Sequence, residues 1–118
     1  MALFEERPLT RRAAEKSFSD RLIALSLKIP KGKVTTYGAL AKAAGGGAMA
    51  ARSVTGILSK AWEAGEKKIP FHRIVYSDGH IWEHPEYEKK RRRLYKEEGI
   101  KLDENNRIVD FQEKLYAL

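Results

Sequence analysis

A histidine and an arginine stand side by side within residues 69–79, IPFHRIVYSDG. An imidazole can accept a proton from a nucleophile or from water near neutral pH, so a pair such as His72 and Arg73 is typical of the rim of an active site. The preceding position, where a nucleophile would be useful, holds Phe71. A phenyl ring has no lone pair to attack carbon, and the chain has no cysteine to supply a thiolate. The segment therefore indicates either a catalyst without its reactive atom or a pocket that binds without reacting.

The histidines of this chain do not form a recognisable metal-binding pattern. His80 and His84 are four residues apart, but Gly79 and Pro85 argue against one helix that presents both. Structural and catalytic zinc sites use thiolates or spacings such as HExxH, and neither occurs together with His72. The sequence therefore predicts no metal site and no cofactor.

The composition predicts one soluble domain with a basic surface. The chain has 118 residues, of which 42% are hydrophobic and 33% charged, as in ordinary globular domains. The net charge of +7 indicates a polyanionic partner, above all nucleic acid, because basic groups release the counterions condensed on phosphates. A basic surface kept only for solubility is the alternative. No signal-peptide core or membrane-length apolar segment is present, so we expect a cytoplasmic protein without membrane contacts, nucleoid-associated when bound to DNA.

Helices that could position a site are predicted in the first half of the chain. Apolar periodicity indicates a helix over residues 17–27, which Pro30 stops. A shorter helix is expected over residues 37–44, with Thr36 or Thr35 as its N-cap and the glycines at 45–47 as its terminator.

The strongest helical pattern lies within residues 48–65. Its expected core face consists of Ala50, Val54, Ile57, Leu58, Ala61 and Trp62. Its opposite, small and polar face consists of Arg52, Ser53, Gly56, Ser59 and Lys60. A glycine inside a helix costs roughly 1 kcal/mol relative to alanine, so Gly56 indicates that something approaches this backbone closely. A helix-turn-helix that binds DNA and close packing on another helix explain the small face equally well.

The second half is expected to add short strands and one basic helix. Residues 73–82, RIVYSDGHIW, predict two strands around a turn at 77–79, and residues 100–111 predict another hairpin around 104–106. Pro85 is expected at position N1 of a helix that Gly99 ends. The basic run at 89–93 is interpreted mainly as a solvated helix face, supported by Glu86–Lys90 and Glu88–Arg92 pairs, with one or two of its residues on phosphate. The sum is a mostly helical α+β domain with a wing.

Four blocks of the sequence together resemble the DNA-binding domain of the O6-alkylguanine-DNA alkyltransferases, in particular the alkyltransferase-like proteins. These blocks are residues 29–47, 50–58, 69–79 and 97–99, IPKGKVTTYGALAKAAGGG, AARSVTGIL, IPFHRIVYSDG and EEG, and they contain Tyr37 and Arg52. Their order and spacing match, and the resemblance covers about residues 18–102. It implies a winged helix-turn-helix-like domain of the alkyltransferase C-terminal type over residues 17–102. Residues 1–16 are then an N-terminal arm and 103–118 a C-terminal tail, which inherit nothing.

The resemblance also implies roles for individual residues on duplex DNA. The helix-turn-helix is expected in the minor groove, where Tyr37 crowds the 3′ phosphate and Arg52 enters the stack and holds the orphaned cytosine. The implied DNA contacts are Thr36, Tyr37, Arg52, Ser53, Gly56, Ser59 and Lys60. The implied lesion pocket consists of Tyr37, Pro70, Phe71, His72, Arg73, Ile74, Trp82 and His84, and backbone groups near Phe71 and Ile74 are expected to bind the guanine edge.

One departure from the repair enzymes of this family sets the expected function. Their motif is Pro-Cys-His-Arg, in which the thiolate accepts the alkyl group and a histidine, oriented by a glutamate, activates it through water. Here His72, Arg73 and a matching Glu98 remain, but Phe71 replaces the cysteine, and the hinge asparagine of the enzymes is missing. Many alkyltransferase-like proteins carry tryptophan at position 71. An arginine in their pocket loop has its nearest counterpart here in His84. Because the thiol is gone and a buried histidine usually needs a partner, the His72–Glu98 pair is interpreted as a brace for the loop.

These residues predict a non-enzymatic sensor of DNA damage. It is expected to bind duplexes that contain O6-alkylguanine, to turn the damaged nucleotide outward, and to flag it for nucleotide excision repair proteins, acting as a monomer. A general or architectural DNA-binding protein without lesion specificity is one alternative. A glycosylase-like enzyme that uses His72 and Glu98 to activate water is the other.

Overall fold

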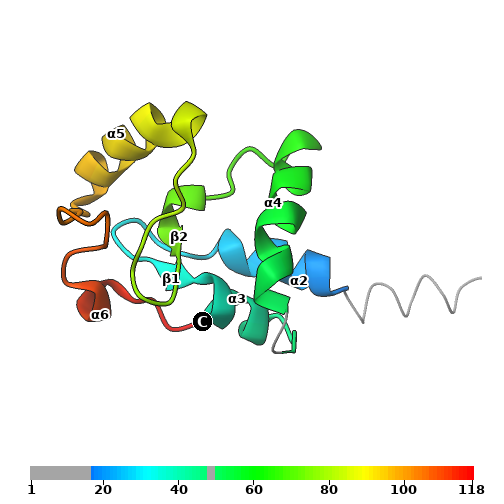
Figure 1. Ribbon diagram of the computed structural model, residues 1–118. Helices are drawn as coiled ribbons and strands as arrows, with labels where there is room; N and C mark the ends of the chain where they lie inside the picture. Colours follow the sequence, from blue (N-terminus) through cyan, green and yellow to red (C-terminus); the bar gives the residue numbers. More distant parts are fainter. Residues whose placement is uncertain (1–16, 48–49) are drawn as a thin grey trace, which may run out of the picture.

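The computed structural model describes residues 17–47 and 50–118, so the expected arm at 1–16 lies outside the described residues. The α-helices are α2 (Phe18–Ser26), α3 (Tyr37–Ala43), α4 (Val54–Glu63), α5 (Glu88–Glu98) and α6 (Phe111–Lys114). The remaining elements are the strands β1 (Thr35–Thr36) and β2 (Ile74–Val75) and the 3₁₀ turns η1 (Ala50–Ser53), η2 (Phe71–Arg73) and η3 (Pro85–Tyr87). Helices α2, α3 and α4 lie at one end, α5 and α6 at the other, with the two strands between them (Figure 1). The predicted α+β class is confirmed.

Two of the predicted helices begin at polar N-cap residues. Ser17 accepts a hydrogen bond from the Asp20 N–H at 3.1 Å, and Thr36 accepts one from the Ala39 N–H at 3.0 Å. Each of these bonds satisfies a backbone donor that the first turn of a helix leaves free. Thr36 is therefore the N-cap of α3, and Thr35 belongs to β1 instead.

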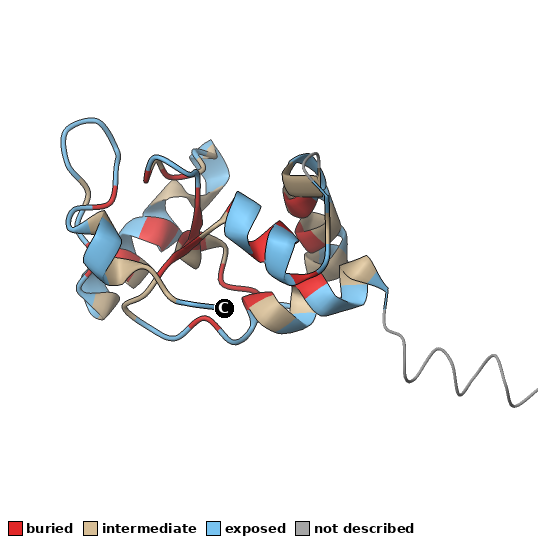
Figure 2. Ribbon diagram, turned by 90° about the horizontal axis from the view of Figure 1, so that it is seen from below, coloured by how far each residue is buried: buried red, intermediate tan, exposed pale blue. Residues whose placement is uncertain are grey.

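The helix expected within residues 48–65 has two parts. Residues 50–53 form the 3₁₀ turn η1, and α4 begins only at Val54, so Arg52 and Ser53 precede the α-helix. Val54 and Leu58 are buried, whereas Trp62 of the expected core face is only half-buried. The buried side chains of α2, α3 and α4 meet in one apolar cluster around Leu22, Leu40 and Leu58, shown by the red segments of these helices in Figure 2.

The strand pairing differs from the predicted wing. β2 pairs in parallel with β1, with Thr35 opposite Ile74, and this contact between distant segments was not predicted. After the turn, the expected second strand is reduced to one antiparallel bridge between Val75 and Ile81. The Ile81 N–H instead donates to the Asn106 carbonyl at 3.1 Å. The predicted wing is therefore present in reduced form: Val75 bridges Ile81 and the Tyr76 N–H donates to the His80 carbonyl at 2.8 Å, while the Ile81 N–H is used by the C-terminal tail.

The C-terminal residues pack against the rest of the domain. The predicted hairpin around 104–106 has one antiparallel bridge, between Leu102 and Ile108. Val34 and Leu115 form a parallel bridge, in which the Val34 N–H donates to the Lys114 carbonyl at 2.9 Å. A second apolar cluster consists of Val34, Val75, Ile81, Tyr95, Ile100 and Ile108, with Leu102, Phe111 and Leu115 packed against it. The tail thus supplies apolar side chains to a core and helps to hold β1.

Helix α5 follows the 3₁₀ turn η3 and ends at Gly99, whose φ of 73° is left-handed as expected for a helix terminator. The predicted Glu88–Arg92 pair is present at 2.8 Å. The predicted Glu86–Lys90 pair is not among the ion pairs of the described residues, because Glu86 lies on a 3₁₀ turn and not on the α-helix. The basic run is mainly exposed, as interpreted from the sequence, with the exception of Arg91, which is buried.

Candidate nucleic-acid interface

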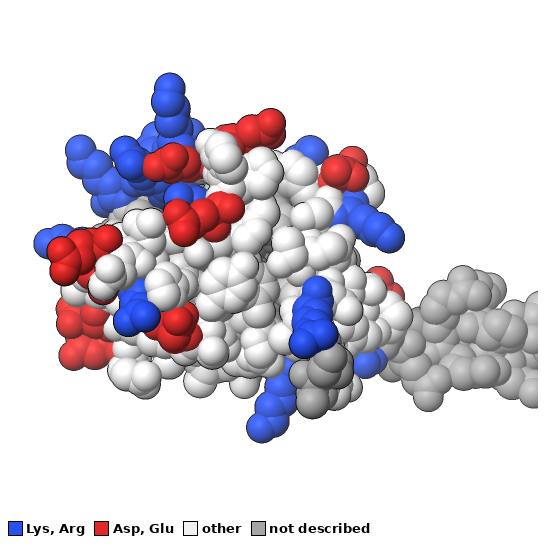
Figure 3. All heavy atoms as spheres, in the orientation of Figure 1, with Lys and Arg blue, Asp and Glu red and all other residues white. Residues whose placement is uncertain are grey.

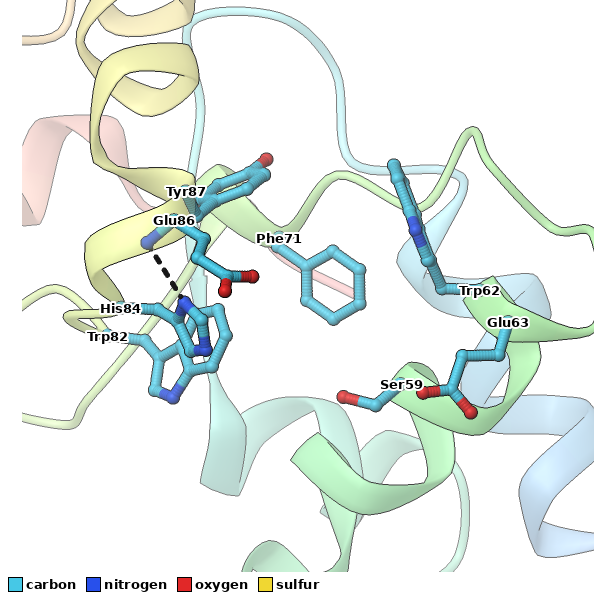
Figure 4. A pocket seen from close by; sticks show the side chains of 8 residues that line it. All are labelled: Ser59, Trp62, Glu63, Phe71, Trp82, His84, Glu86 and Tyr87. Carbon is cyan, nitrogen blue, oxygen red and sulfur yellow. Dashed lines mark hydrogen bonds between the residues drawn. The ribbon is translucent and has the colours of Figure 1, made fainter.

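A cavity opens between α4 and the segment of residues 82–87, above the ring of Phe71 (Figure 4). Its volume is about 350 Å³, within the range of about 300–1,000 Å³ typical of ligand pockets. The residues that line it are Ser59, Trp62, Glu63, Phe71, Trp82, His84, Glu86 and Tyr87. Two chain segments far apart in sequence therefore form its opposite walls, with Phe71 between them.

The walls of this cavity are mostly aromatic. The centroid of the Phe71 ring lies 5.6 Å from that of Trp62, 6.1 Å from that of Trp82 and 6.2 Å from that of Tyr87. The ring of His84 lies 5.2 Å from that of Trp82. Flipped or single-stranded bases bind proteins by stacking on such rings, because every base presents a π face. The cavity therefore suits a planar, largely apolar ring system.

Three of the residues predicted for the lesion pocket line this cavity, namely Phe71, Trp82 and His84. Pro70, His72, Arg73 and Ile74 are not among its lining residues, and neither is Tyr37. Successive side chains of a 3₁₀ turn point about 120° apart, so η2 directs Phe71 into the cavity while His72 and Arg73 turn to the opposite side. Of the PFHR stretch, the structure therefore brings only Phe71 to this cavity, and the lesion contacts of the other three residues stay a prediction.

The prediction missed half of the lining residues: Trp62, Glu63, Glu86 and Tyr87. Trp62 was assigned to the core face of its helix. It is only half-buried because it forms part of the wall that faces the cavity. The other signal in the sequence was WEHPEY, a short run that combines aromatic and acidic residues around a proline. Such a run between a strand and a helix is typical of a binding loop.

The carboxylate of Glu98 accepts several hydrogen bonds and so forms a hydrogen-bond hub next to η2. Its carboxylate accepts from Arg73 Nε at 3.0 Å and Nη2 at 2.8 Å, and Oε1 accepts from the Gly32 N–H at 3.0 Å. It also lies 2.7 Å from Nε2 of His72. Burial works to raise the pKa of this carboxyl, but the hydrogen bonds from Arg73, Gly32 and His72 outweigh it and lower the pKa of Glu98 to about 2. Glu98 is therefore ionised and ties η2 to α5 and to the turn at Gly32.

His72 is placed for structural bracing. Burial lowers its pKa, against the opposing effect of Glu98, so the imidazole is neutral near pH 7 and Nε2–H donates to Glu98. Its carbonyl accepts a hydrogen bond from the Tyr95 hydroxyl at 2.6 Å. Nδ1 is buried, with no hydrogen-bond partner among the described residues, and His72 does not line the cavity. The pair expected as a brace is thus present on the far side of η2 from the cavity.

Tyr37 begins α3 and is buried, not displayed on the surface. Its ring lies 5.2 Å from that of Tyr76, and the side chain of Thr55 on α4 lies near its hydroxyl. Burial is the main cause that raises the pKa of its hydroxyl, so Tyr37 is uncharged. In this structure Tyr37 connects the start of α3 with α4. The expected contact between Tyr37 and DNA would therefore have to form at the surface where these two helices meet.

The small face of α4 is open to solvent. Arg52, Ser53, Gly56 and Lys60 are exposed, and Ser59 is half-buried at the cavity. A β-carbon built on Gly56 would meet nothing within 4 Å. Close packing of this face on another helix is therefore excluded within the described part of the chain. The face remains available to a partner molecule.

The walls of the cavity are supported by two residues of the basic run on α5, Lys90 and Arg91, for which no such role was predicted. Arg91 donates from Nη1 to the Trp82 carbonyl at 3.1 Å and so holds the segment that carries Trp82. The ammonium of Lys90 lies 4.8 Å from the centroid of the Trp62 ring, a cation–π contact from α5 to the end of α4. Helix α5 thus fixes the spacing of the two walls.

Comparisons with known proteins agree with this arrangement. The model of the family described as 6-O-methylguanine DNA methyltransferase, DNA binding domain, matches residues 17–100. The DNA base-flipping protein of Escherichia coli (strain K12) is 37% identical over 95 residues, which covers 80% of this chain and 70% of that protein. The DNA base-flipping protein of Shigella flexneri matches with the same figures.

Solved structures share the fold. The crystal structure of S. pombe Atl1 in complex with damaged DNA containing O6-carboxymethylguanine matches with a TM-score of 0.67 at 26% identity, covering 84% of this chain and 94% of that one. A second structure of S. pombe ATL in complex with DNA matches with a TM-score of 0.66 at 27% identity and the same coverage. The expected fold and family are confirmed: the chain belongs to the family of the 6-O-methylguanine DNA methyltransferase DNA-binding domain and is a homologue of its alkyltransferase-like members.

Proposed function

We propose that this protein recognises O6-alkylguanine in duplex DNA, turns the damaged nucleotide out of the stack, and holds it unrepaired. The observation that carries the proposal is the aromatic cavity over Phe71, at the position where the repair enzymes of the family hold their reactive cysteine. The DNA base-flipping relatives and the structures of S. pombe Atl1 with damaged DNA support it.

One helix connects the cavity with the proposed intercalating residue. Arg52 lies on the turn that enters α4, and Ser59, Trp62 and Glu63 near the end of α4 line the cavity. The seven helical steps from Arg52 to Ser59 span roughly 10 Å, so a rigid element sets the distance between the intercalating residue and the cavity. Extruding a base costs a few kcal/mol, least for a badly paired one. Arg52 in the stack and aromatic stacking in the cavity are the interactions that offset this cost.

The remaining proposed contacts lie around the same helix. We assign phosphate and groove contacts to Thr36, Ser53, Gly56, Ser59 and Lys60, whose small or flexible side chains let the backbone of α4 approach DNA. Tyr37 is assigned to the 3′ side of the damaged nucleotide, at the junction of α3 with α4. The bound complex is proposed to recruit nucleotide excision repair proteins.

A duplex with one O6-methylguanine should bind at least about tenfold more tightly than the unmodified duplex, because a weak base pair lowers the cost of extrusion. Fluorescence anisotropy at one stated salt concentration measures both dissociation constants. Equal affinities would favour the general DNA-binding alternative. We expect a monomer to form the complex, which the stoichiometry of the same titration checks.

Incubation with DNA that carries a radiolabelled O6-methyl group should leave all of the label on the DNA. Phe71 cannot accept an alkyl group, and the chain contains no cysteine. Label on the protein would contradict a purely binding role. Chromatography of the same DNA tests the glycosylase alternative, which predicts free base; we expect none, since neither His72 nor Glu98 lines the cavity.

A further inference from the structure

The charged residues that line the cavity are all acidic. Glu63 extends from the end of α4 and Glu86 from η3, so the two carboxylates belong to opposite walls. In Figure 4 the carboxylate of Glu86 points toward Phe71, and that of Glu63 lies on the same side of α4 as Ser59. Among the described residues that line the cavity there is no lysine or arginine.

Two lysines lie behind the aromatic walls. Lys67 and Lys90 stand 5.0 and 4.8 Å from the centroid of the Trp62 ring, and Lys90 stands 5.9 Å from that of Tyr87. Both lysines line a separate hollow, which Trp62 and Tyr87 also border, and not the cavity itself. The rings of Trp62 and Tyr87 therefore separate these ammonium groups from a bound base.

Two further basic residues at the cavity walls, Arg91 and His84, are already engaged. Arg91 donates to the Trp82 carbonyl. His84 lines the cavity, but its Nδ1 accepts from the Glu86 N–H at 3.2 Å, and its ring lies against that of Trp82 at an interplanar angle of 35°. In the view of Figure 3, lysine and arginine gather over α5, while the middle of the face is largely uncharged. The lysines and arginines of the described residues thus border the cavity or lie outside it, and none lines it.

We infer that the cavity selects damaged guanines by the charge of the O6 substituent, and that Glu63 and Glu86 impose this selection. This inference rests on the proposed function. A substituent that ends in a carboxylate must approach two carboxylates with no cation in front of the aromatic walls, which is unfavourable. Neutral substituents meet no such repulsion, and cationic ones are attracted by the carboxylates and by the π faces. The adduct in the S. pombe Atl1 complex, O6-carboxymethylguanine, ends in such a carboxylate and so belongs to the class that this chain should disfavour.

Three duplexes that differ only in the O6 substituent test the inference. The carboxymethyl and carbamoylmethyl groups have nearly the same shape, but only the first is charged, and a 2-aminoethyl group is cationic. For the natural protein the carboxymethyl duplex should bind about fivefold more weakly than the carbamoylmethyl duplex, a difference of about 1 kcal/mol that suits exposed carboxylates. The aminoethyl duplex should bind at least as tightly as the carbamoylmethyl one. The difference should shrink when salt rises from about 0.05 to about 0.5 M.

The double variant Glu63→Gln/Glu86→Gln should bring the carboxymethyl and carbamoylmethyl affinities within about twofold of each other, since the amides keep the shape of the walls. The matched control Glu97→Gln/Glu104→Gln changes the net charge equally at exposed positions outside the cavity and should keep the fivefold ratio. Equal binding of these two duplexes by the natural protein, or an unchanged ratio in the Glu63/Glu86 variant, would overturn the inference. Failure of the proposed function is distinct, because methylated and unmodified duplexes would then bind equally.

Discussion

Replacing Arg52 with alanine should weaken binding to a duplex containing O6-methylguanine by about 30-fold or more, while binding to unmodified DNA falls only a few-fold. Arg52 is exposed on η1, directly before α4, so its removal disturbs no buried contact. In the proposed complex its planar cation fills the gap in the stack and donates to the unpaired cytosine, interactions that exist only when a base is extruded. Without these interactions of Arg52, less of the free-energy cost of extruding the base is offset, and the complex is weaker. Anisotropy titrations of both duplexes at one salt concentration measure the effect.

Two control substitutions, one of a lysine and one of an arginine, distinguish intercalation by Arg52 from a nonspecific effect of its positive charge. Lys60→Ala removes a proposed phosphate contact on α4, so it should weaken both duplexes alike and reduce the slope of log affinity against log salt by about 1. Arg93→Ala removes an exposed charge on α5 and should change little. If Arg52→Ala weakens both duplexes equally, as expected for Lys60→Ala, then Arg52 is a phosphate contact and not the intercalating residue.

Replacing Glu98 with alanine should lower the free energy of unfolding by about 3–5 kcal/mol, as when one partner of a buried ion pair is removed. The side chain of Glu98 is only 3% exposed, and its loss leaves the Arg73 guanidinium, His72 Nε2 and the Gly32 N–H without their acceptor. Arg73 also donates to the Ile29 carbonyl at 2.7 Å, so the damage extends to the turn before β1. Urea unfolding followed by tryptophan fluorescence measures the change.

The neighbouring substitution Glu97→Ala is the matched control, because Glu97 is exposed on the same turn of α5 and should cost no more than about 0.5 kcal/mol. A cost for Glu98→Ala as small as that of Glu97→Ala would show that the hub does not stabilise the fold. If the folded fraction of the Glu98 variant retains its preference for O6-methylguanine, the hub acts through stability and not through the cavity.

The same hub predicts a direction for pH dependence. A carboxyl whose pKa falls from 4.5 to about 2 on folding stabilises the protein above pH 4.5, and this contribution is lost as the pH falls toward 2. His72 has the same sign: its pKa is lowered below 6.5 by burial, so the unfolded chain takes up a proton first as the pH falls. Unfolding free energy should therefore decrease as the pH falls below about 6.5 and be nearly flat above it, up to mild alkaline pH. In Glu98→Ala the part of this dependence between pH 4.5 and 2 should be weaker.

Local signals in the sequence were sufficient for the helices. Ser17 and Thr36 mark helix starts because a side-chain oxygen satisfies a nearby backbone donor, and Gly99 marks an end because only glycine enters the left-handed region without strain. The start of α4 was misplaced, since periodicity does not distinguish the 3₁₀ turn at 50–53 from a first α-helical turn. The parallel pairing of Thr35 with Ile74 joins segments distant in sequence, and two-residue strands are too short to leave a periodic pattern.

By itself, the sequence identified the family of this protein and predicted a binding role without alkyl transfer. Phe71 has no atom that can accept an alkyl group, and the 118 residues contain no cysteine thiolate, whatever the fold. The tertiary structure alone decided which side chains form the cavity. The direction of a side chain on a 3₁₀ turn and the approach of residues 82–87 to α4 depend on nonlocal packing, so Phe71 faces the cavity while Arg73 turns to Glu98. For the same reason Glu63 and Glu86 lie on opposite sides of one cavity. In the sequence alone they look like ordinary surface acids.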